Sequence, residues 1–391
     1  MKRNRCLFLL LAAGMLWSCG GIDPESRNLS KYAENEYPEG CVYRAGTPYE
    51  VGQLPQAAPD ARIRNVVLMI GDGMGLEQVS TALVANRGQL YLATMPFTGI
   101  ARTYSANRLI TDSGAAGTAL ATGQKTTNYV IAVDTAGRPL PSLMNLARQS
   151  GRRTGVSVVC RLNDATPAVF CCHNTDRDAA EQIAADYPDC GVDFIAGGGM
   201  KYWRNRSDGR DLLSEMAGKG YHTCETPEAL SRASALPVVA VLDSLELPVA
   251  LKRGDRFRNM VGKALELLDN EQGFFLMVEG SCIDDWCHAN RIDNAVEEIL
   301  DFDRTVGDVL RWAAADAHTL VVVTADHATG GLTLLDGDIH TGEVMVNFSS
   351  TGHNGICVPV FAYGPGADRF VGMYENSCLS RKLAGILSAK Q

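Results

Sequence analysis

The stretch Asn65-Val-Val-Leu-Met-Ile70 is a short, largely apolar run that ends in the glycine-rich turn Gly71-Asp-Gly-Met-Gly75. An amphipathic stretch follows from Leu76 to Asn86. Such near-continuous apolar runs predict strands that are buried on both faces of a sheet. Similar runs begin at Val156, Val192, Val238, Phe274, Leu320 and Val358, and helical periodicity fills the gaps between them. This alternation predicts an α/β fold in which a central, mostly parallel sheet is sandwiched by helices.

Oxygen and imidazole ligands follow four of the predicted strands within a few residues: Asp72, Asp164 with Thr166, Glu279, and Asp326-His327. In open α/β sheets, ligands bind beyond the carboxyl ends of the strands. A single acidic residue after a strand is common by chance, whereas ligand residues after four separate strands are not. We therefore expect these side chains to meet at one edge of the sheet.

Three of the seven histidines stand in contexts that suit a metal site. Asp284 and His288 are four residues apart, so on a helix they share one face. His327 follows an acid, and His353 lies in a glycine-flanked loop. A single histidine is more often a surface or core residue, but the joint pattern with acids at strand ends favours metal binding. Imidazoles with carboxylates suit zinc, whereas Asp72, Thr166 and Glu279 offer only oxygen, which suits magnesium.

Ser113 stands in the segment Ile110-Thr-Asp-Ser-Gly-Ala-Ala-Gly-Thr118. The small residues after the serine allow a helix to begin close to another backbone, with free amides that can receive a phosphate. The alternative interpretation is that Ser113 caps the helix. No Gly-x-Ser-x-Gly motif surrounds it, so an acyl-transfer triad is not indicated.

Six segments resemble, in order, the signature motifs of the alkaline phosphatase family, and the resemblance covers roughly Arg64 to Gly366. They are Ile70–Gly75, Ile110–Thr118, Asn163–Pro167 with Asp176-Arg177, Val278–Asp284 with His288, Thr324–Gly331, and Gly352-His353. The resemblance implies an alkaline-phosphatase-like fold. It also implies hydrolysis of small phosphate monoesters through a phosphoserine intermediate.

The resemblance implies a role for each matching residue. One zinc ion would be held by Asp284, His288 and His353, and a second by Asp72, Asp326 and His327. One magnesium ion would be held by Asp72, Thr166 and Glu279, with Asp164 ordering its water shell. Ser113 would be the nucleophile, and Arg177 would bind two phosphoryl oxygens as the substrate-binding and catalytic cation.

Two departures from the family pattern stand out. Only 25 residues separate His327 from His353, which predicts a short crown region and an open site. Asp285 stands where family members often carry lysine, histidine or tryptophan, so we expect weaker phosphate retention or an altered pH dependence. A phosphodiesterase or sulfatase on the same bimetal core, and a non-catalytic metal-binding lipoprotein, remain alternative functions.

The N-terminus predicts export. A basic start, Met1 to Arg5, precedes an apolar run to Trp17 that is too short for a membrane span. Leu16-Trp-Ser-Cys-Gly20 resembles a lipoprotein box, which predicts a signal peptide over 1–19 and lipidation at Cys19. The chain would then be anchored in the bacterial cell envelope, on the periplasmic side. Trp17 is bulky for such a box, so simple secretion is the alternative.

Residues 20–63 are polar and proline-containing and predict a tether and an extended arm, and 64–391 form the predicted catalytic domain. The net charge of −9 argues against nucleic acid as a partner. Family members commonly form homodimers, so we expect a homodimer. Ten cysteines remain besides Cys6 and Cys19, and an oxidising compartment permits disulfides whose connectivity the sequence does not define.

Overall fold

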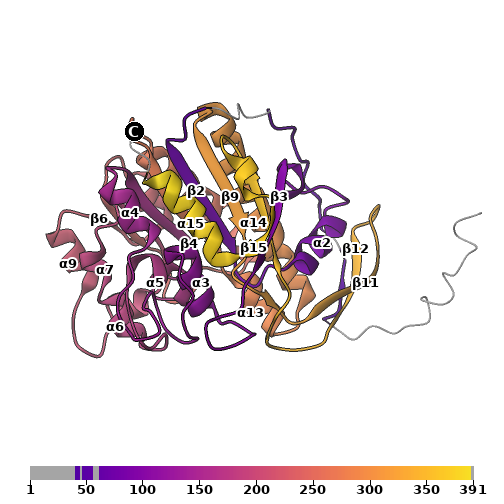
Figure 1. Cartoon of the computed structure of the whole chain (residues 1–391), viewed down its shortest axis with the longest axis horizontal. Helices are drawn as coiled ribbons and strands as arrows, with labels where there is room; N and C mark the ends of the chain where they lie inside the picture. The colour runs from indigo at the N-terminus through magenta and orange to yellow at the C-terminus, as the bar shows by residue number, and fades with distance from the viewer. Residues whose placement is uncertain (1–39, 45, 56–60, 389–391) are drawn as a thin grey trace, which may run out of the picture. The chain divides into compact units, whose positions relative to one another are not determined.

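A ten-stranded sheet forms the centre of the protein in a computed structural model that describes residues 40–44, 46–55 and 61–388 (Figure 1). From edge to edge the strands are β15 (Gly372–Glu375), β3 (Phe97–Arg102), β14 (Val358–Tyr363), β9 (Thr319–Thr324), β2 (Asn65–Gly71), β8 (Phe274–Gly280), β4 (Arg153–Arg161), β5 (Phe194–Gly198), β7 (Val238–Val241) and β6 (His222–Cys224). Only β14 runs antiparallel to its neighbours in this sheet. The predicted α/β class with a mostly parallel sheet is confirmed.

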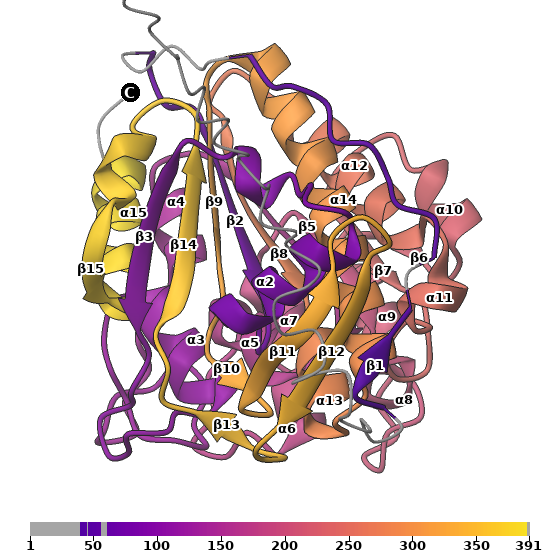
Figure 2. The ribbon, with the colours of Figure 1, turned by 90° about the vertical axis from the view of Figure 1, so that its right-hand side faces the viewer.

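Helices cover both faces of the sheet, which stands between two helical layers in Figure 2. One face carries α12 (Arg256–Leu268) against β4 and β5, and α14 (Ile292–Asp316) against β9 and β2. The other face carries α3 (Ser113–Thr122), α4 (Leu143–Gln149), α5 (Ala165–Cys171) and α15 (Asn376–Leu387). This double cover explains why the central strands are apolar throughout.

The remaining helices are short, except for α2, which packs beside α14. They are α2 (Leu76–Ala85), η2 (Leu92–Thr94), α6 (Ala180–Ala184), α7 (Tyr187–Cys190), α8 (Met200–Trp203), α9 (Leu212–Gly218), α10 (Pro227–Ser231), α11 (Ala250–Arg253), α13 (Cys282–His288) and η3 (Ala367–Phe370). Among the described residues, no helix combines the length and apolar character that a membrane crossing requires. The predicted signal peptide 1–19 and its Cys19 lie outside the described residues.

A small antiparallel sheet joins a strand near the start of the described residues to a hairpin that lies between β10 (Ala328–Thr329) and β13 (His353–Asn354). It consists of β1 (Val42–Tyr43), β12 (Glu343–Phe348) and β11 (Leu332–Asp338). The β11–β12 hairpin and the bridge between β10 and β13 occupy most of the segment between His327 and His353. The predicted crown is therefore a single hairpin, joined by a strand of the arm.

The arm segment 46–55 is held to α14 by a buried polar contact. The Tyr49 hydroxyl donates to Asp303 Oδ2, and the Tyr49 ring stacks on Tyr91 with a centroid distance of 6.2 Å. The Asp303 carboxylate also accepts from the backbone amides of Tyr91 at 2.8 Å and Leu92 at 2.9 Å. Burial raises the pKa of Asp303 to about 6, although these donors favour its charged form. The charged form of this buried carboxylate is therefore stabilised by each of its hydrogen-bond donors.

We expect Tyr49→Phe to lower the free energy of unfolding by about 1–2 kcal/mol, because a buried carboxylate loses one donor. Denaturant unfolding of the two proteins measures the difference. Tyr104→Phe is the control, since it removes the hydroxyl of a tyrosine whose side chain is exposed. A loss in Tyr49→Phe below about 0.5 kcal/mol, as for an ordinary surface substitution, would contradict the role of this contact.

Candidate active site

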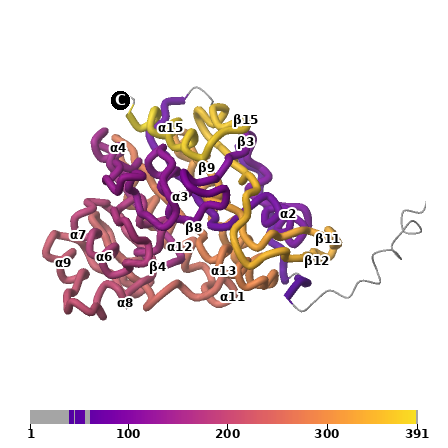
Figure 3. Tube along the Cα trace, turned by 60° about the horizontal axis from the view of Figure 1, so that its bottom comes forward, coloured from indigo at the N-terminus to yellow at the C-terminus, as the bar shows by residue number. Residues whose placement is uncertain are grey.

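The carboxyl ends of the central strands bring the predicted ligands to one edge of the sheet. β2 ends at Gly71, directly before Asp72, and β9 ends two residues before Asp326. Glu279 lies near the end of β8, and the Asp72 amide donates to the carbonyl of the next residue, Gly280, at 3.2 Å. Figure 3 turns this edge toward the viewer, with β8 between α3 and α13. The parallel arrangement thus gathers residues that are far apart in sequence.

Asp284, His288 and His353 form the first cluster of possible metal ligands. Asp284 and His288 lie one turn apart on α13, and His288 Nε2 is 3.1 Å from Asp284 Oδ2. His353 lies on β13, opposite Thr329 of β10. Its Nε2 is 3.1 Å from His288 Nε2 and 3.7 Å from Asp284 Oδ1. The helix and the strand bridge thus point one carboxylate and two imidazoles at a common position.

Backbone carbonyls fix the orientation of both imidazoles in this cluster. His288 Nδ1 contacts the carbonyl of Thr351, and His353 Nδ1 lies 2.9 Å from the carbonyl of Thr111. A carbonyl only accepts, so both Nδ1 atoms carry protons and both Nε2 lone pairs face the cluster. Two lone pairs at such short range require a cation between them. In the protein alone a proton takes this place, since the hydrogen bond to Asp284 raises the pKa of His288 to about 9.

Asp72, Asp326 and His327 lie together at the second position. His327 Nε2 is 3.4 Å from Asp72 Oδ1 and 3.2 Å from Asp326 Oδ2. Asp284 belongs to this group as well, since Asp72, Asp284 and His327 form the second cluster of possible ligands. Burial raises the pKa of Asp72, and burial with the charge of Asp284 raises that of Asp326 to about 6. Carboxylates crowded in this way are stabilised by bound cations.

The predicted oxygen-only set consists of Asp72, Thr166 and Glu279. Thr166 is the second residue of α5, and its Oγ1 is buried with no hydrogen-bond partner among the described residues. Asp72 Oδ1 is also buried and has no hydrogen-bond partner among the described residues. Burial and the charge of Asp164 raise the pKa of Glu279 to about 8. Buried polar atoms are rarely left unpaired, so these orphaned oxygens fit a hard cation such as magnesium.

Ser113 is the first residue of α3 and is almost fully buried. Its Oγ lies 3.2 Å from His327 Nε2, beside the second cluster. The helix cap is Asp112, whose Oδ1 accepts from the Ala115 amide at 2.9 Å, so the alternative that Ser113 is the cap is wrong. Gly114 permits the close packing, since a Cβ there would lie 2.7 Å from the Val130 carbonyl. The serine hydroxyl is therefore free to face the site.

Arg177 is held beside Ser113 by Asp112. Its Nη1 lies 2.9 Å from Asp112 Oδ2, and its Nη2 lies 3.8 Å from Asp164 Oδ1. The Tyr129 backbone contacts both residues. Its amide donates to Asp112 Oδ2 at 3.0 Å, and its carbonyl accepts from the Arg177 amide at 2.9 Å. Tyr129 has a φ of 69°, a conformation rare for residues other than glycine. These bonds hold the guanidinium in place.

Ser113, Arg177 and the first cluster of possible metal ligands line one pocket of about 470 Å³. Its lining includes Ser113, Arg177, Asp284, His288 and His353, together with Ile110 and Tyr129. Asp285, next to Asp284 on α13, is not among the lining residues, and burial with the charges of Asp284 and Asp164 raises its pKa to about 6. The predicted weaker phosphate retention stays a prediction.

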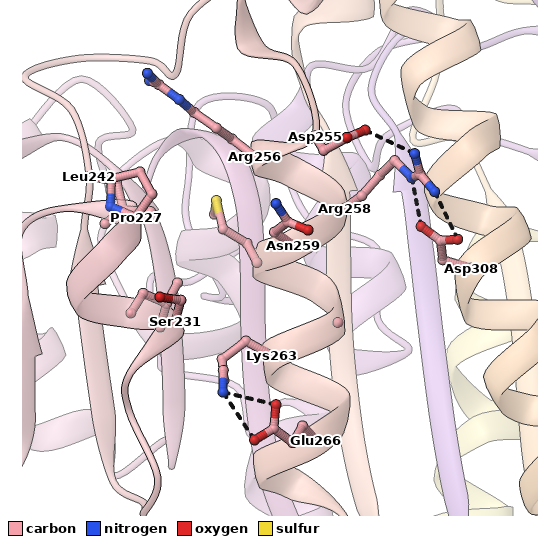
Figure 4. Close-up of a pocket in the computed structure, with 13 residues that line it drawn as sticks. Pro227, Ser231, Leu242, Asp255, Arg256, Arg258, Asn259, Lys263, Glu266 and Asp308 are labelled. Carbon is pink, nitrogen blue, oxygen red and sulfur yellow. Dashed lines mark hydrogen bonds and ion pairs between the residues drawn. The ribbon is translucent and has the colours of Figure 1, made fainter.

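A larger cavity of about 620 Å³ lies between α10 and α12, away from the acids and histidines. Figure 4 shows most of its charged side chains paired with one another, whereas Arg256 points away from them. Arg258 binds Asp308 and Asp255, and Lys263 binds Glu266 at 2.8 Å. Among the described residues, neither group of possible metal ligands lies in this cavity and no histidine lines it, so the candidate active site is the smaller pocket at the sheet edge.

Asp112 and Thr329 support the site but were not singled out from the sequence. Thr329 Oγ1 donates to Asp284 Oδ1 and lies 3.2 Å from His327 Nδ1, so it orients one side chain of each cluster. Both residues stand inside the quoted motifs, directly before Ser113 and two residues after His327. Position within a motif is the signal that could have found them.

Residues 63–347 match the profile of the alkaline phosphatase family. The chain belongs to the alkaline phosphatase family. It is 32% identical to alkaline phosphatase 4 of Bacillus subtilis (strain 168), with 81% of this chain and 87% of that protein aligned. The structure of the alkaline phosphatase from the Antarctic bacterium TAB5 has a TM-score of 0.80 and 33% identity, over 85% of this chain and 99% of that one.

Membership of the alkaline phosphatase family confirms the predicted resemblance, the fold and the class of enzyme, which is a phosphate monoester hydrolase. A variant of the TAB5 alkaline phosphatase was solved with Mg bound in its M3 site, at a TM-score of 0.80 and 32% identity. That metal is a property of the TAB5 protein. For this chain, the clustered ligands and orphaned oxygens indicate metal binding independently.

Proposed function

We propose that the protein hydrolyses small phosphate monoesters through a phosphoserine at Ser113, with two zinc ions and one magnesium ion as cofactors. The observation that carries this proposal is the position of Ser113 Oγ, which is 3.2 Å from His327 Nε2 and in the same pocket as Arg177. A serine hydroxyl is a weak nucleophile unless a neighbouring group activates it. A metal ion held by the ligand cluster beside this buried serine would supply that activation.

The proposed metal ligands follow the family pattern. One zinc ion is assigned to Asp284, His288 and His353, the second to Asp72, Asp326 and His327, and magnesium to Asp72, Thr166 and Glu279, with Asp164 beside it. When bound, such ions lower the pKa of a nearby hydroxyl or water and stabilise charge on entering and leaving oxygens. Asp284 lies in both clusters of possible ligands, so it couples the two zinc positions.

The chain's own groups perform the remaining tasks. Ser113 Oγ attacks phosphorus, the ester oxygen leaves, and water then attacks the phosphoserine to release phosphate and restore the hydroxyl. Arg177 presents a planar pair of donors that matches two phosphoryl oxygens. Asp112 fixes that guanidinium and caps α3 at once, so the serine and the cation are positioned by one carboxylate.

Substrate comparison tests the proposal against its rivals. Turnover of an aryl phosphate, an aryl phosphodiester and an aryl sulfate is measured with added zinc and magnesium. A monoesterase prefers the dianionic phosphate, which Arg177 and the full magnesium set favour. A diester or sulfate preference would assign the same core to a diesterase or a sulfatase. Absence of turnover on all three would favour a non-catalytic metal-binding protein.

We expect Arg177→Lys to weaken competitive inhibition by inorganic phosphate about tenfold, because lysine keeps the charge but loses the paired donors. The inhibition constant from steady-state kinetics measures this effect. Arg138→Lys is the matched control, since Arg138 pairs with Asp134 on the surface. Equal phosphate inhibition in Arg177→Lys and the control would exclude Arg177 from phosphate binding.

Export and assembly remain parts of the proposal. We propose a signal peptide over 1–19, a lipid anchor at Cys19 on the periplasmic side of the cell envelope, and a homodimer in solution. Cell fractionation tests the anchor: Cys19→Ala should leave the membrane fraction, and a variant that stays there would contradict it. The mass of the purified protein in solution tests the dimer.

A further inference from the structure

Two cysteines lie at the ends of the segment that carries Arg177. Cys171 is the last residue of α5, and Cys190 is the last residue of α7. Both residues are partly exposed, and both line one pocket of about 310 Å³, separate from the candidate active site. Their sulfur groups are hydrogen-bonding neighbours. The chain therefore leaves α5 and returns beside it at the end of α7.

We propose that Cys171 and Cys190 form a disulfide that closes the loop from the end of α5 to the end of α7. The side chains already meet across the pocket, so no large movement of the two helix ends is needed. Because both thiols face an open pocket, a small disulfide such as oxidised glutathione can reach them. The proposal concerns covalent structure and does not depend on the proposed function.

Cys172 is the competing partner, and the structure disfavours it. Its side chain is 1% exposed and does not line the pocket. Cys190 is a hydrogen-bonding neighbour of Cys171, whereas Cys172 affects neither thiol through such a bond. An oxidant that enters the pocket thus meets Cys171 and Cys190 together. The adjacent Cys172 stays behind them in the core.

The local charges indicate the order of the exchange steps. The hydrogen bond with Cys171, assisted by the nearby Arg148 cation, lowers the pKa of Cys190 although burial opposes this. The Cys190 thiolate attacks one sulfur of the small disulfide, which forms a mixed disulfide and releases one thiol. Cys171, after losing its proton, attacks the Cys190 sulfur and releases the second thiol. Two protein thiols are oxidised and one small disulfide is reduced.

The bond would enclose the backbone contacts that position Arg177. Within the loop, Asn174 pairs with Ile131 through two backbone bonds of 2.9 and 2.7 Å, and the Arg177 amide donates to Tyr129. At the loop's end, Arg148 donates to the Cys190 carbonyl at 2.8 Å. A cross-link at the base of this loop restricts the unfolded chain and holds both ends of the segment.

Peptide mapping of the full-length protein tests the proposal. The protein is equilibrated with oxidised glutathione, free thiols are blocked, and trypsin is added without reductant. Trypsin releases Cys171 and Cys172 in peptide 162–177 and Cys190 in peptide 178–201. The expected result is one linked species of these two peptides, which persists in Cys172→Ala and is lost in Cys171→Ala and Cys190→Ala. Free thiols, a Cys171–Cys172 bond or a Cys172–Cys190 bond in the unsubstituted protein would overturn the proposal.

Thermal unfolding gives a second readout. Reduction with dithiothreitol should lower the Tm of the oxidised protein by about 4 °C, as expected for a loop of this size in a chain of this length. The Tm of Cys171→Ala should not respond to dithiothreitol. Cys378→Ala is the matched control, because this partly buried thiol lies on α15, and it should respond as the unsubstituted protein does. A response in Cys171→Ala equal to that of the control would overturn the proposal.

Discussion

Ser113→Ala is expected to lower kcat for an aryl phosphate by about 10³-fold or more, because removal of a nucleophile abolishes the covalent route. The hydroxyl lies 3.2 Å from His327 Nε2, and alanine leaves no replacement for it. Alanine suits the start of α3, whose cap Asp112 is untouched. The fold and the metal ligands should therefore survive, and Tm with bound zinc per chain checks this.

The matched control is Ser157→Ala. Ser157 is a buried serine on β4 whose hydroxyl has no hydrogen-bond partner among the described residues, so its removal should leave kcat unchanged. Residual activity in Ser113→Ala would come from direct attack of water on the ester. A loss of less than about tenfold would count against covalent catalysis, provided that zinc content is normal.

Removal of metals by a chelator is expected to abolish turnover and to lower the Tm by about 5 °C. Without cations, the buried carboxylates of Asp72, Asp284 and Asp326 face one another. Readdition of zinc and magnesium should restore both activity and Tm. Full activity after exhaustive dialysis, with metal analysis showing none bound, would refute the proposed cofactors.

The metal-free protein should also lose stability as pH rises from about 7 to 9. In the protein without metals, the pKa of Glu279 is raised to about 8 and that of His288 to about 9, so both bind protons that the unfolded chain has released. The depressed pKa values of His327 and His353, about 4, act in the opposite direction but only below about pH 6.5. Tm measured against pH, with and without metals, checks this. A flat profile without metals, or the same decline with metals, would contradict it.

The central sheet could be predicted from the sequence because its strands are buried on both faces. β2, β8 and β9 are buried along their full length and coincide with continuous apolar runs. β3 was missed, since its exposed and buried residues alternate, and the short strands β6 and β15 were missed because they are largely exposed edges. The antiparallel direction of β14 was not predicted either, because an apolar run carries no sign of strand direction.

The candidate site was predicted mainly through motifs. The order of the motifs predicted Ser113, Arg177 and the proposed ligand residues, and the rule on strand ends gave a physical reason for their meeting. The contacts between side chains of different helices and strands could not be predicted from the sequence. Examples are the position of Asp284 in both ligand clusters, the double role of Asp112, and the contact of Cys171 with Cys190. Each depends on side-chain directions across elements that the sequence separates.

Direct detection of the phosphorylated residue tests the central claim most directly. The metal-loaded protein is mixed with an aryl phosphate, quenched in acid during turnover and digested with trypsin, and peptide 109–125, which contains Ser113, is sequenced by mass spectrometry. We predict one phosphoryl group on Ser113, absent from Ser113→Ala. A protein that turns over the ester with no phosphoryl group on any residue, or with one on a residue other than Ser113, would contradict the account.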